Sequence, residues 1–196
     1  MFKKVRIQNV SYLAPSWSDM GEMAVALAKK LKNKKLKFDR IIALAKGGLP
    51  WARQLQDLLD IPKLSSVEIR SYTGIGKASQ KPVVTQKLPV AIKGEHILIY
   101  DDVVDTGETV ACAKKYLLGE KKASSVVVAS HFFKKHSKIK VDIFAKQTDA
   151  WIIFPHDSGE MIRLLKKEWK HMDSKQMKSN LLRIGTERSI IDFILT

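Results

Sequence analysis

The chain has 196 residues, of which 45% are hydrophobic and 28% are charged. This composition excludes a disordered or fibrous protein and leaves room for a full globular core. Lys and Arg number 35 against 20 Asp and Glu, so the formal net charge is +15 and the surface should attract anions. Three interpretations of the charge stay open: a solvated lysine-rich surface, a polyanionic small substrate such as a diphosphate, or nucleic acid, in that order.

The cysteine content and the apolar runs bear on where the protein works. A single cysteine, Cys112, excludes an internal disulfide framework and favours a reducing compartment. No apolar run approaches the roughly eighteen residues of a membrane span, and the first residues do not have the pattern of an export signal. We therefore expect a cytoplasmic protein without a membrane segment.

Short apolar runs alternate with segments of helical spacing along most of the chain. In chain order we predict a helix at 15–32 with Ser16 or Ser18 as its N-cap, a strand at 40–45, a helix at 50–59, a strand at 63–72, a loop at 73–88, a strand at 97–100, a helix at 110–118, and strands at 125–130 and 151–154. This alternation predicts a three-layer α/β fold, in which helices cover both faces of a central, mainly parallel sheet.

The last part of the chain departs from this alternation. From residue 158 to the end the pattern is helical without further strands, and we expect Gly185 to divide it into separate helices. The chain is therefore expected to have one domain at 1–157 and a helical C-terminal extension at 158–196.

The turns after two predicted strands carry residues suited to ligand binding. Lys46, Gly47 and Gly48 follow the strand at 40–45, and the sequence DDVVDTGET at 101–109 follows the strand at 97–100. In parallel α/β sheets, ligands bind beyond the carboxyl ends of the strands. Residues 106–109 are small, hydroxyl or acidic, and they leave backbone N–H groups to hold a phosphate at the start of a helix.

The carboxylates at 101–105 need a different partner, because they would repel a phosphate. Hydroxyl groups or a bridging Mg²⁺ are suitable partners for Asp101 and Asp102, and a sugar phosphate offers both kinds of group. The alternative is that the two carboxylates only cap the next helix. P-loop, dinucleotide and calcium-loop patterns fail on spacing.

The segment ILIYDDVVDTGET at 97–109 resembles the phosphoribosyl-diphosphate signature of type I phosphoribosyltransferases. Two other segments occur in the order of that family: AKGGL at 45–49 is similar to its diphosphate-binding loop, and Ser71-Tyr72 opens a loop at 71–88 similar to its flexible loop. Lys46 departs from the family, which commonly has Arg there; the charge is kept but the planar fork is lost. The resemblance covers about residues 38 to 160 and implies the family's fold with a small base-binding hood.

The segment at 131–157 points to the base. Phe132-Phe133-Lys134 and DAWIIFP at 149–155 resemble the 6-oxopurine branch, most nearly its xanthine and guanine members. The resemblance implies that Lys134 donates to the exocyclic oxygen of the purine, that Trp151 stacks on the ring and that Ile152 supplies backbone contacts. The lysine ammonium group donates hydrogen bonds but cannot accept them, so it suits the carbonyl oxygen of an oxopurine better than the amino group of adenine. Taken alone, Lys134 would be a solvated charge and Trp151 a core aromatic residue.

The resemblance also implies an activity. The enzyme would transfer the 5-phosphoribosyl group from phosphoribosyl diphosphate to xanthine, guanine or hypoxanthine in purine salvage, giving diphosphate and a nucleoside monophosphate. Mg²⁺ would be the cofactor, with Asp101 and Asp102 as metal-binding residues, and the expected assembly is a homodimer or homotetramer. Asp105, Ser71 and Tyr72 are the expected catalytic residues. The residues expected to bind phosphoribosyl diphosphate are Lys46, Gly47, Gly48, Asp101, Asp102, Asp105, Thr106, Gly107, Glu108 and Thr109.

Two alternatives stay open. The chain could be a regulator of the same fold that senses the activated sugar and binds nucleic acid through its basic tail at 163–188, although nucleic acid is the less favoured partner. It could also carry out the same chemistry on orotate, uracil or adenine. The sequence does not rank the three oxopurines, and it does not give the oligomeric state, the role of the extension or any control by nucleotides.

Overall fold

The computed structural model describes residues 2–70 and 81–195, and the chain divides into two compact units. We call Met23–Thr148 the sheet unit, and Met1–Glu22 together with Asp149–Thr196 the terminal unit. Helix α1 (Trp17–Asn33) begins in the terminal unit and continues in the sheet unit. Across the described residues, no helix combines the length and the apolar character that crossing a membrane requires.

The sheet unit is built on six strands in the order β5-β4-β3-β6-β7-β8. All neighbouring pairs are parallel except β4 with β5, which is antiparallel. This arrangement confirms the predicted α/β fold with a mainly parallel central sheet. The strand bounds are β3 (Arg40–Ala45), β4 (Lys63–Arg70), β5 (Val83–Gln86), β6 (His96–Val104), β7 (Ser125–Phe133) and β8 (Ile143–Gln147).

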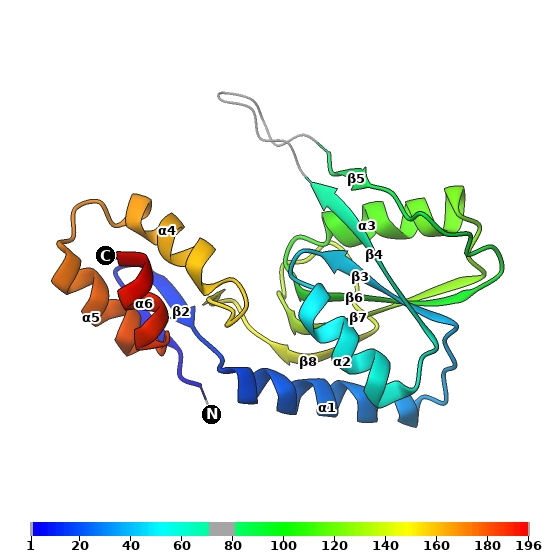
Figure 1. Ribbon diagram of the computed structural model, residues 1–196, viewed down its shortest axis with the longest axis horizontal. Coiled ribbons are helices and arrows are strands. Elements are labelled where there is room, and N and C mark those ends of the chain that lie inside the picture. Colours follow the sequence, from blue (N-terminus) through cyan, green and yellow to red (C-terminus); the bar gives the residue numbers. More distant parts are fainter. Residues whose placement is uncertain (1, 71–80, 196) are drawn as a thin grey trace. The chain divides into compact units, whose positions relative to one another are not determined.

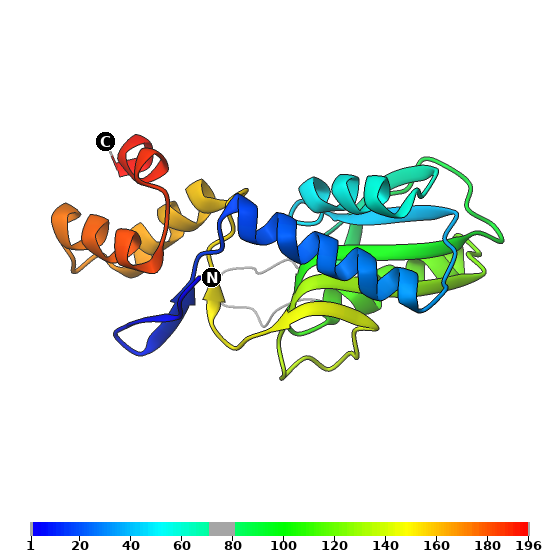
Figure 2. The same cartoon turned by 90° about the horizontal axis from the view of Figure 1, so that it is seen from below.

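Helices cover both faces of this sheet, so it forms the middle of three layers (Figure 1). Helix α3 (Glu108–Lys115) continues into the π-helix η1 (Tyr116–Glu120), and both pack on the face that carries Ile42 and Leu44. Helix α2 (Leu49–Leu59) contacts β3, β4 and β6 and buries Trp51, Ala52 and Leu55. Figure 2 shows α1 running beside β8, where the Lys30 ammonium group donates to the Phe144 carbonyl at 2.7 Å.

The terminal unit has a small sheet and three helices of its own. The sheet has the order β1-β2-β9, in which β1 (Val5–Ile7) pairs antiparallel with β2 (Val10–Leu13) and β2 pairs parallel with β9 (Trp151–Ile152). The helices are α4 (Ser158–Glu168), α5 (Ser174–Ile184) and α6 (Arg188–Leu195). They bury a separate core that includes Ile162, Leu181 and Ile191. The structure thus groups strands from the N-terminal region with the C-terminal helices.

The predicted helix ends are confirmed at two places. Ser16 caps α1 through its hydroxyl group, which accepts from the Asp19 N–H at 3.1 Å, while the Asp19 carboxylate accepts from the Ser16 N–H at 2.9 Å. Gly185 follows α5 with a φ of 109°, a left-handed conformation that suits glycine and ends the helix. These caps explain why the two helical segments begin and end where the sequence predicts.

Three predictions about strands are wrong. Strand β6 does not stop at Tyr100: pairing with β7 extends it to Val104, so Asp101 and Asp102 lie within the strand. Residues 83–86, predicted as loop, form β5 because they pair with β4. The segment at 151–154 gives only the short β9, which joins the sheet of the terminal unit rather than the parallel sheet.

Candidate functional site

The two ligand-binding turns predicted from the sequence lie beside each other in the sheet unit. Strands β3 and β6 are parallel neighbours, with Ala43 opposite Tyr100, so the turn after β3 lies next to the end of β6. A Cβ atom added at Gly47 would lie 2.7 Å from Cγ and 2.8 Å from Oδ1 of Asp102, and closer still to Oδ2. Only a glycine lets the backbone of this turn approach the Asp102 carboxyl group so closely.

At Gly48, backbone atoms rather than a side chain leave no room for a Cβ atom. A Cβ atom there would lie 2.7 Å from the carbonyl oxygens of both Leu44 and Tyr100. Gly48 also begins α2, and its N–H donates to the Leu44 carbonyl at 2.9 Å. The second glycine therefore allows the turn to fold tightly onto two strands, whereas Gly47 allows it to approach the carboxyl group.

Two adjacent carboxyl groups mark the end of β6. Asp102 is buried, and its Oδ1 accepts from the Val103 N–H at 2.7 Å, while Oδ1 of Asp101 accepts from the Asp102 N–H at 3.1 Å. Burial and the neighbouring Asp102 carboxylate raise the pKa of Asp101 well above its usual range. Two negative charges at such a position are costly without a compensating cation or hydroxyl partners.

The segment after these carboxyl groups leads directly into a helix. Asp105 and Thr106 are exposed, and Gly107, with a φ of 85°, is the N-cap of α3. Gly107 has no side chain that could cap α3, and the Thr106 hydroxyl oxygen accepts from the Glu108 N–H at 3.4 Å. The first backbone N–H groups of a helix, together with its dipole, attract an anion, so the start of α3 is suited to a phosphate group.

Residues 134–139 form a turn that follows β7 and packs along the segment 104–108. Backbone hydrogen bonds fix it at both ends: the Lys134 N–H donates to the Val104 carbonyl, and the Lys138 N–H donates to the Thr106 carbonyl, each at 3.0 Å. A Cβ atom at Gly107 would lie 2.7 Å from the Ser137 hydroxyl oxygen. The turn therefore holds the segment before α3 in place. Neither segment has a local sequence signal for this contact, since the two are about thirty residues apart.

Lys134 is buried, with 6% of its surface exposed. Burying a lysine is costly unless its ammonium group has partners, so this is not a solvated surface charge. Its backbone contact with Val104 places it at the same edge of the sheet as the carboxyl groups. The structure thus brings Lys46, Gly47, Gly48, residues 101–109 and Lys134 together in one unit.

A second group of charged residues stands beside the first turn. Lys46 is exposed and follows a cis peptide bond with Ala45 at the end of β3. On the neighbouring strand, Glu68 accepts from Arg70 at 2.6 Å and from Thr85 at 3.0 Å. Hydrogen bonds from Arg70 and Thr85, with smaller effects from nearby positive charges that include Lys46, lower the pKa of Glu68. Lys46 and Arg70 thus share this negatively charged neighbour.

Buried aromatic residues support the sheet below the carboxyl groups. The Tyr100 hydroxyl group is hydrogen-bonded to Nδ1 of His131, and the ring of Trp51 from α2 lies 5.3 Å from the His131 ring. Burial, with the nearby Asp102 and Asp101 carboxylates, raises the pKa of Tyr100 well above its usual value. Closely packed side chains therefore support the end of β6.

The remaining predicted residues lie elsewhere. Trp151 and Ile152 form β9 in the terminal unit, where Ile152 is buried and 47% of Trp151 is exposed. Nε1 of Trp151 donates to the Met161 sulfur at 3.1 Å, so the ring is not the core aromatic residue of the alternative interpretation. Ser71 and Tyr72 lie outside the described residues.

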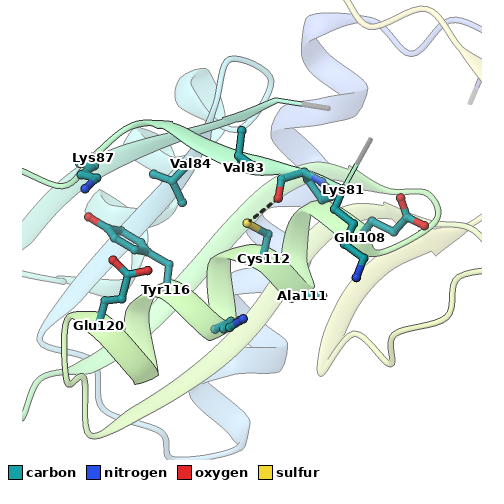
Figure 3. Close-up of a pocket in the computed structure, with 11 residues that line it drawn as sticks. Lys81, Val83, Val84, Lys87, Glu108, Ala111, Cys112, Tyr116 and Glu120 are labelled. Carbon is teal, nitrogen blue, oxygen red and sulfur yellow. Dashed lines mark hydrogen bonds between the residues drawn. The ribbon is translucent and has the colours of Figure 1, made fainter. Parts of the chain in front are cut away.

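A pocket of about 680 Å³ lies between β5 and α3 (Figure 3). It has an apolar floor that includes Cys112 and Tyr116 and a charged rim that includes Lys81 and Lys87. Cys112 donates to the Pro82 carbonyl at 3.2 Å, and burial raises the pKa of its thiol. Of the predicted site residues that the structure describes, Glu108 alone lines this pocket, and several residues from Lys81 to Lys87 line it from the loop predicted at 71–88.

The described residues do not form a metal site by themselves. Among residues 2–70 and 81–195, no three His, Cys, Asp or Glu side chains gather in a way that could hold a metal ion. Asp101 and Asp102 offer only hard carboxylate oxygens, which Mg²⁺ prefers when substrate oxygens and water complete its coordination. The residues at the end of β6 therefore fit a magnesium ion that arrives with a phosphorylated substrate.

Comparisons with known proteins show what the chain as a whole is similar to. Residues 19–160 match the family model of the phosphoribosyl transferase domain. The chain is 30% identical over 156 residues to the xanthine-guanine phosphoribosyltransferase of Gluconobacter oxydans (strain 621H), covering 79% of this chain and 89% of that protein. The protein of the same name from Nitratidesulfovibrio vulgaris (strain DP4) is 33% identical over 145 residues, covering 73% and 83%. The crystal structure of the purine phosphoribosyltransferase from Pyrococcus horikoshii Ot3 matches with a TM-score of 0.66 and 30% identity, covering 74% and 93%.

Proposed function

Because the chain belongs to the phosphoribosyltransferase family, we propose that it transfers the 5-phosphoribosyl group of phosphoribosyl diphosphate to a 6-oxopurine base. The products are diphosphate and a nucleoside monophosphate. The observation that carries this proposal is the shared edge of the sheet, where two glycines, two carboxyl groups and the start of α3 lie side by side. The names of the relatives, which refer to xanthine, guanine and purine, support a purine as the acceptor.

The turn after β3 would bind the leaving diphosphate. As the bond to the anomeric carbon breaks, negative charge grows on the diphosphate and positive charge grows on the sugar. Lys46 and the backbone N–H groups of Gly47 and Gly48 would stabilise that negative charge. Mg²⁺ bound with the substrate would neutralise part of the diphosphate charge. Arg would bind diphosphate through a planar fork, whereas Lys46 acts as a point charge.

The end of β6 and the start of α3 would hold the sugar. Asp101 and Asp102 would accept hydrogen bonds from the ribose hydroxyl groups or bind the substrate's magnesium. The backbone of residues 106–109 would hold the 5-phosphate at the N-terminus of α3. Held at both ends, the sugar presents its anomeric carbon to the base in one orientation.

Three residues that match the 6-oxopurine branch would recognise the base. Lys134 would donate to the exocyclic oxygen of the purine, Trp151 would stack on its ring, and Ile152 would contribute backbone contacts. Asp105 would accept the proton that the ring nitrogen loses when it attacks the sugar. Lys134 is buried, so its ammonium group needs a hydrogen-bond acceptor. The exocyclic oxygen of an oxopurine would be such an acceptor.

Other parts of the proposal rest on the family alone. Ser71 and Tyr72 would act at a loop that closes over the reacting sugar and excludes water. Residues 158–196 would be an extension of a phosphoribosyltransferase domain at 1–157, and the protein would act in the cytoplasm as a homodimer or homotetramer.

The experiment that tests this function is a panel of bases. Xanthine, guanine, hypoxanthine, adenine, orotate and uracil are each incubated with phosphoribosyl diphosphate and Mg²⁺, and release of diphosphate is measured. We expect turnover with at least one of the three oxopurines. Diphosphate release with none of the six bases would contradict the proposal and favour a regulator that only senses the sugar. Turnover with orotate, uracil or adenine alone would contradict the role of Lys134.

A further inference from the structure

A histidine contacts the carboxylate that is proposed to accept the proton. Nε2 of His136 lies 2.5 Å from Oδ1 of Asp105, although the two residues are 31 positions apart in the sequence. An ionised carboxylate can only accept hydrogen bonds, so Nε2 is the donor. The contact joins the 134–139 turn to the segment before α3.

We propose that His136 is a positioning residue that fixes the Asp105 carboxylate for proton transfer; this rests on the proposed function. The terminal torsion of an aspartate side chain is broad and nearly two-fold, so an exposed carboxylate rotates easily. A hydrogen bond from His136 to Oδ1 selects one orientation and leaves Oδ2 as the oxygen that faces the purine ring. Preorganising the acceptor in this way removes a rotation that would otherwise precede each proton transfer.

The turn that carries His136 is itself held firmly. Backbone hydrogen bonds from Lys134 to Val104 and from Lys138 to Thr106 fix its first residue and its next-to-last residue. Lys138 also contacts the Glu108 carboxylate at 3.4 Å. These contacts lie on both sides of the His136–Asp105 pair. The histidine is therefore presented to Asp105 by a rigid backbone, as a positioning role requires.

The contact would matter little for stability alone. Both side chains are more than half exposed, at 59% for His136 and 53% for Asp105, and exposed ion pairs contribute little to folding. The same turn begins with Lys134, so one short segment would carry both the lysine that reads the base and the histidine that orients the proton acceptor. The effect of His136 should thus appear in the chemical step rather than in the unfolding transition.

The test compares single-turnover rates of nucleotide formation, because product release can limit kcat. His136→Ala should lower the rate roughly ten- to a hundredfold, with the KM for phosphoribosyl diphosphate changed less than about twofold and the unfolding temperature unchanged. His136→Gln should restore most of the rate, because its amide can donate from the position of Nε2. The matched control is Lys135→Ala, an exposed neighbour in the same turn, which should leave the rate unchanged.

A double-mutant cycle with Asp105→Asn tests whether His136 acts through Asp105. In that background, His136→Ala should have little further effect. Three results would each overturn the inference: a normal or faster rate for His136→Ala, failure of His136→Gln to restore the rate, or an undiminished effect of His136→Ala in the Asp105→Asn background. Each of these three results is obtained with an active wild-type protein, so it would overturn the inference without touching the proposed function. An inactive wild-type protein would overturn both.

Discussion

Replacing Gly47 by alanine should damage the active site more than the fold. The new methyl group would lie 2.7 Å from Cγ of Asp102 and 2.8 Å from its Oδ1, well inside van der Waals contact. The carboxyl group cannot move freely, because Asp102 is buried and its Oδ1 accepts from the Val103 N–H at 2.7 Å. Either the turn after β3 moves away or the carboxyl group rotates, and both changes separate groups that the proposed mechanism needs together.

The size of the effect follows from the distances. Relieving the overlap requires a displacement on the order of 1 Å, and a misplacement of that size can reduce turnover about a hundredfold. Overpacking a buried site typically costs about 1–3 kcal/mol of unfolding free energy. Because the atoms that clash at Gly47 belong to a side chain, we expect a stability cost near the lower limit. At Gly48 the clashing atoms are backbone oxygens of two strands, so Gly48→Ala should approach the upper limit.

The assay combines kcat/KM for phosphoribosyl diphosphate with thermal unfolding of each variant. Gly119→Ala is a matched control, because nothing lies within 4 Å of a Cβ atom at Gly119; it should keep full activity and equal or slightly higher stability. Gly47→Ala should lose activity with a small change in unfolding temperature, and Gly48→Ala should lose several degrees. Normal activity for Gly47→Ala would refute the argument that Gly47 must approach the Asp102 carboxyl group.

Three further predictions test single side chains. Asp102→Asn should raise the barrier to turnover by about 3–4 kcal/mol with little change in unfolding temperature, and near-normal turnover would count against the assignment of Asp102. Lys134→Met should raise the KM for the oxopurine about 10- to 100-fold, because a hydrogen bond from a charged group is lost. The unfolding temperature and the affinity for phosphoribosyl diphosphate should change much less. Equal losses of affinity for both substrates would argue for a structural role of Lys134. Hydrogen bonding from Arg40 at 2.8 Å lowers the pKa of Glu95 in the folded protein below its ordinary 4.5. The ionised Glu95 carboxylate therefore stabilises the folded state above pH 4.5, and this stabilisation is lost as the pH falls through the pKa of Glu95 in the folded protein. Urea unfolding at several pH values should therefore show the stability difference between wild type and Glu95→Gln shrinking below pH 4.5.

The family and the layered fold could be predicted because local patterns carry them. The strand at 40–45 and the helix at 15–32, with Ser16 or Ser18 as its N-cap, were predicted from apolar spacing and a capping residue; the structure confirms both elements and shows Ser16 as the cap. The family was predicted from the segment at 97–109, and the comparisons confirm it. In these segments the residues that determine the local structure are neighbours in the sequence.

The errors occur where a partner distant in the sequence determines the structure. Residues 83–86 have only a short β-prone run, and their pairing with β4 makes them a strand. Asp101 and Asp102 look like the start of a turn, since charged residues rarely continue a buried strand; pairing with β7 keeps them in β6. The contact of His136 with Asp105 has no local signal either, because it depends on how the 134–139 turn folds back.

The distribution of the lysines bears on the three interpretations of the +15 charge. Among the residues that the structure describes, Lys134 is the one buried lysine, and most of the others are exposed. Most of the positive charge is therefore a solvated surface that attracts anions from a distance. Such attraction is screened by salt, whereas contacts within the site are screened much less. Raising the ionic strength should thus lower kcat/KM for phosphoribosyl diphosphate while leaving the single-turnover rate at saturating substrate nearly constant; a parallel fall in both would show that the lysine excess acts in the chemical step.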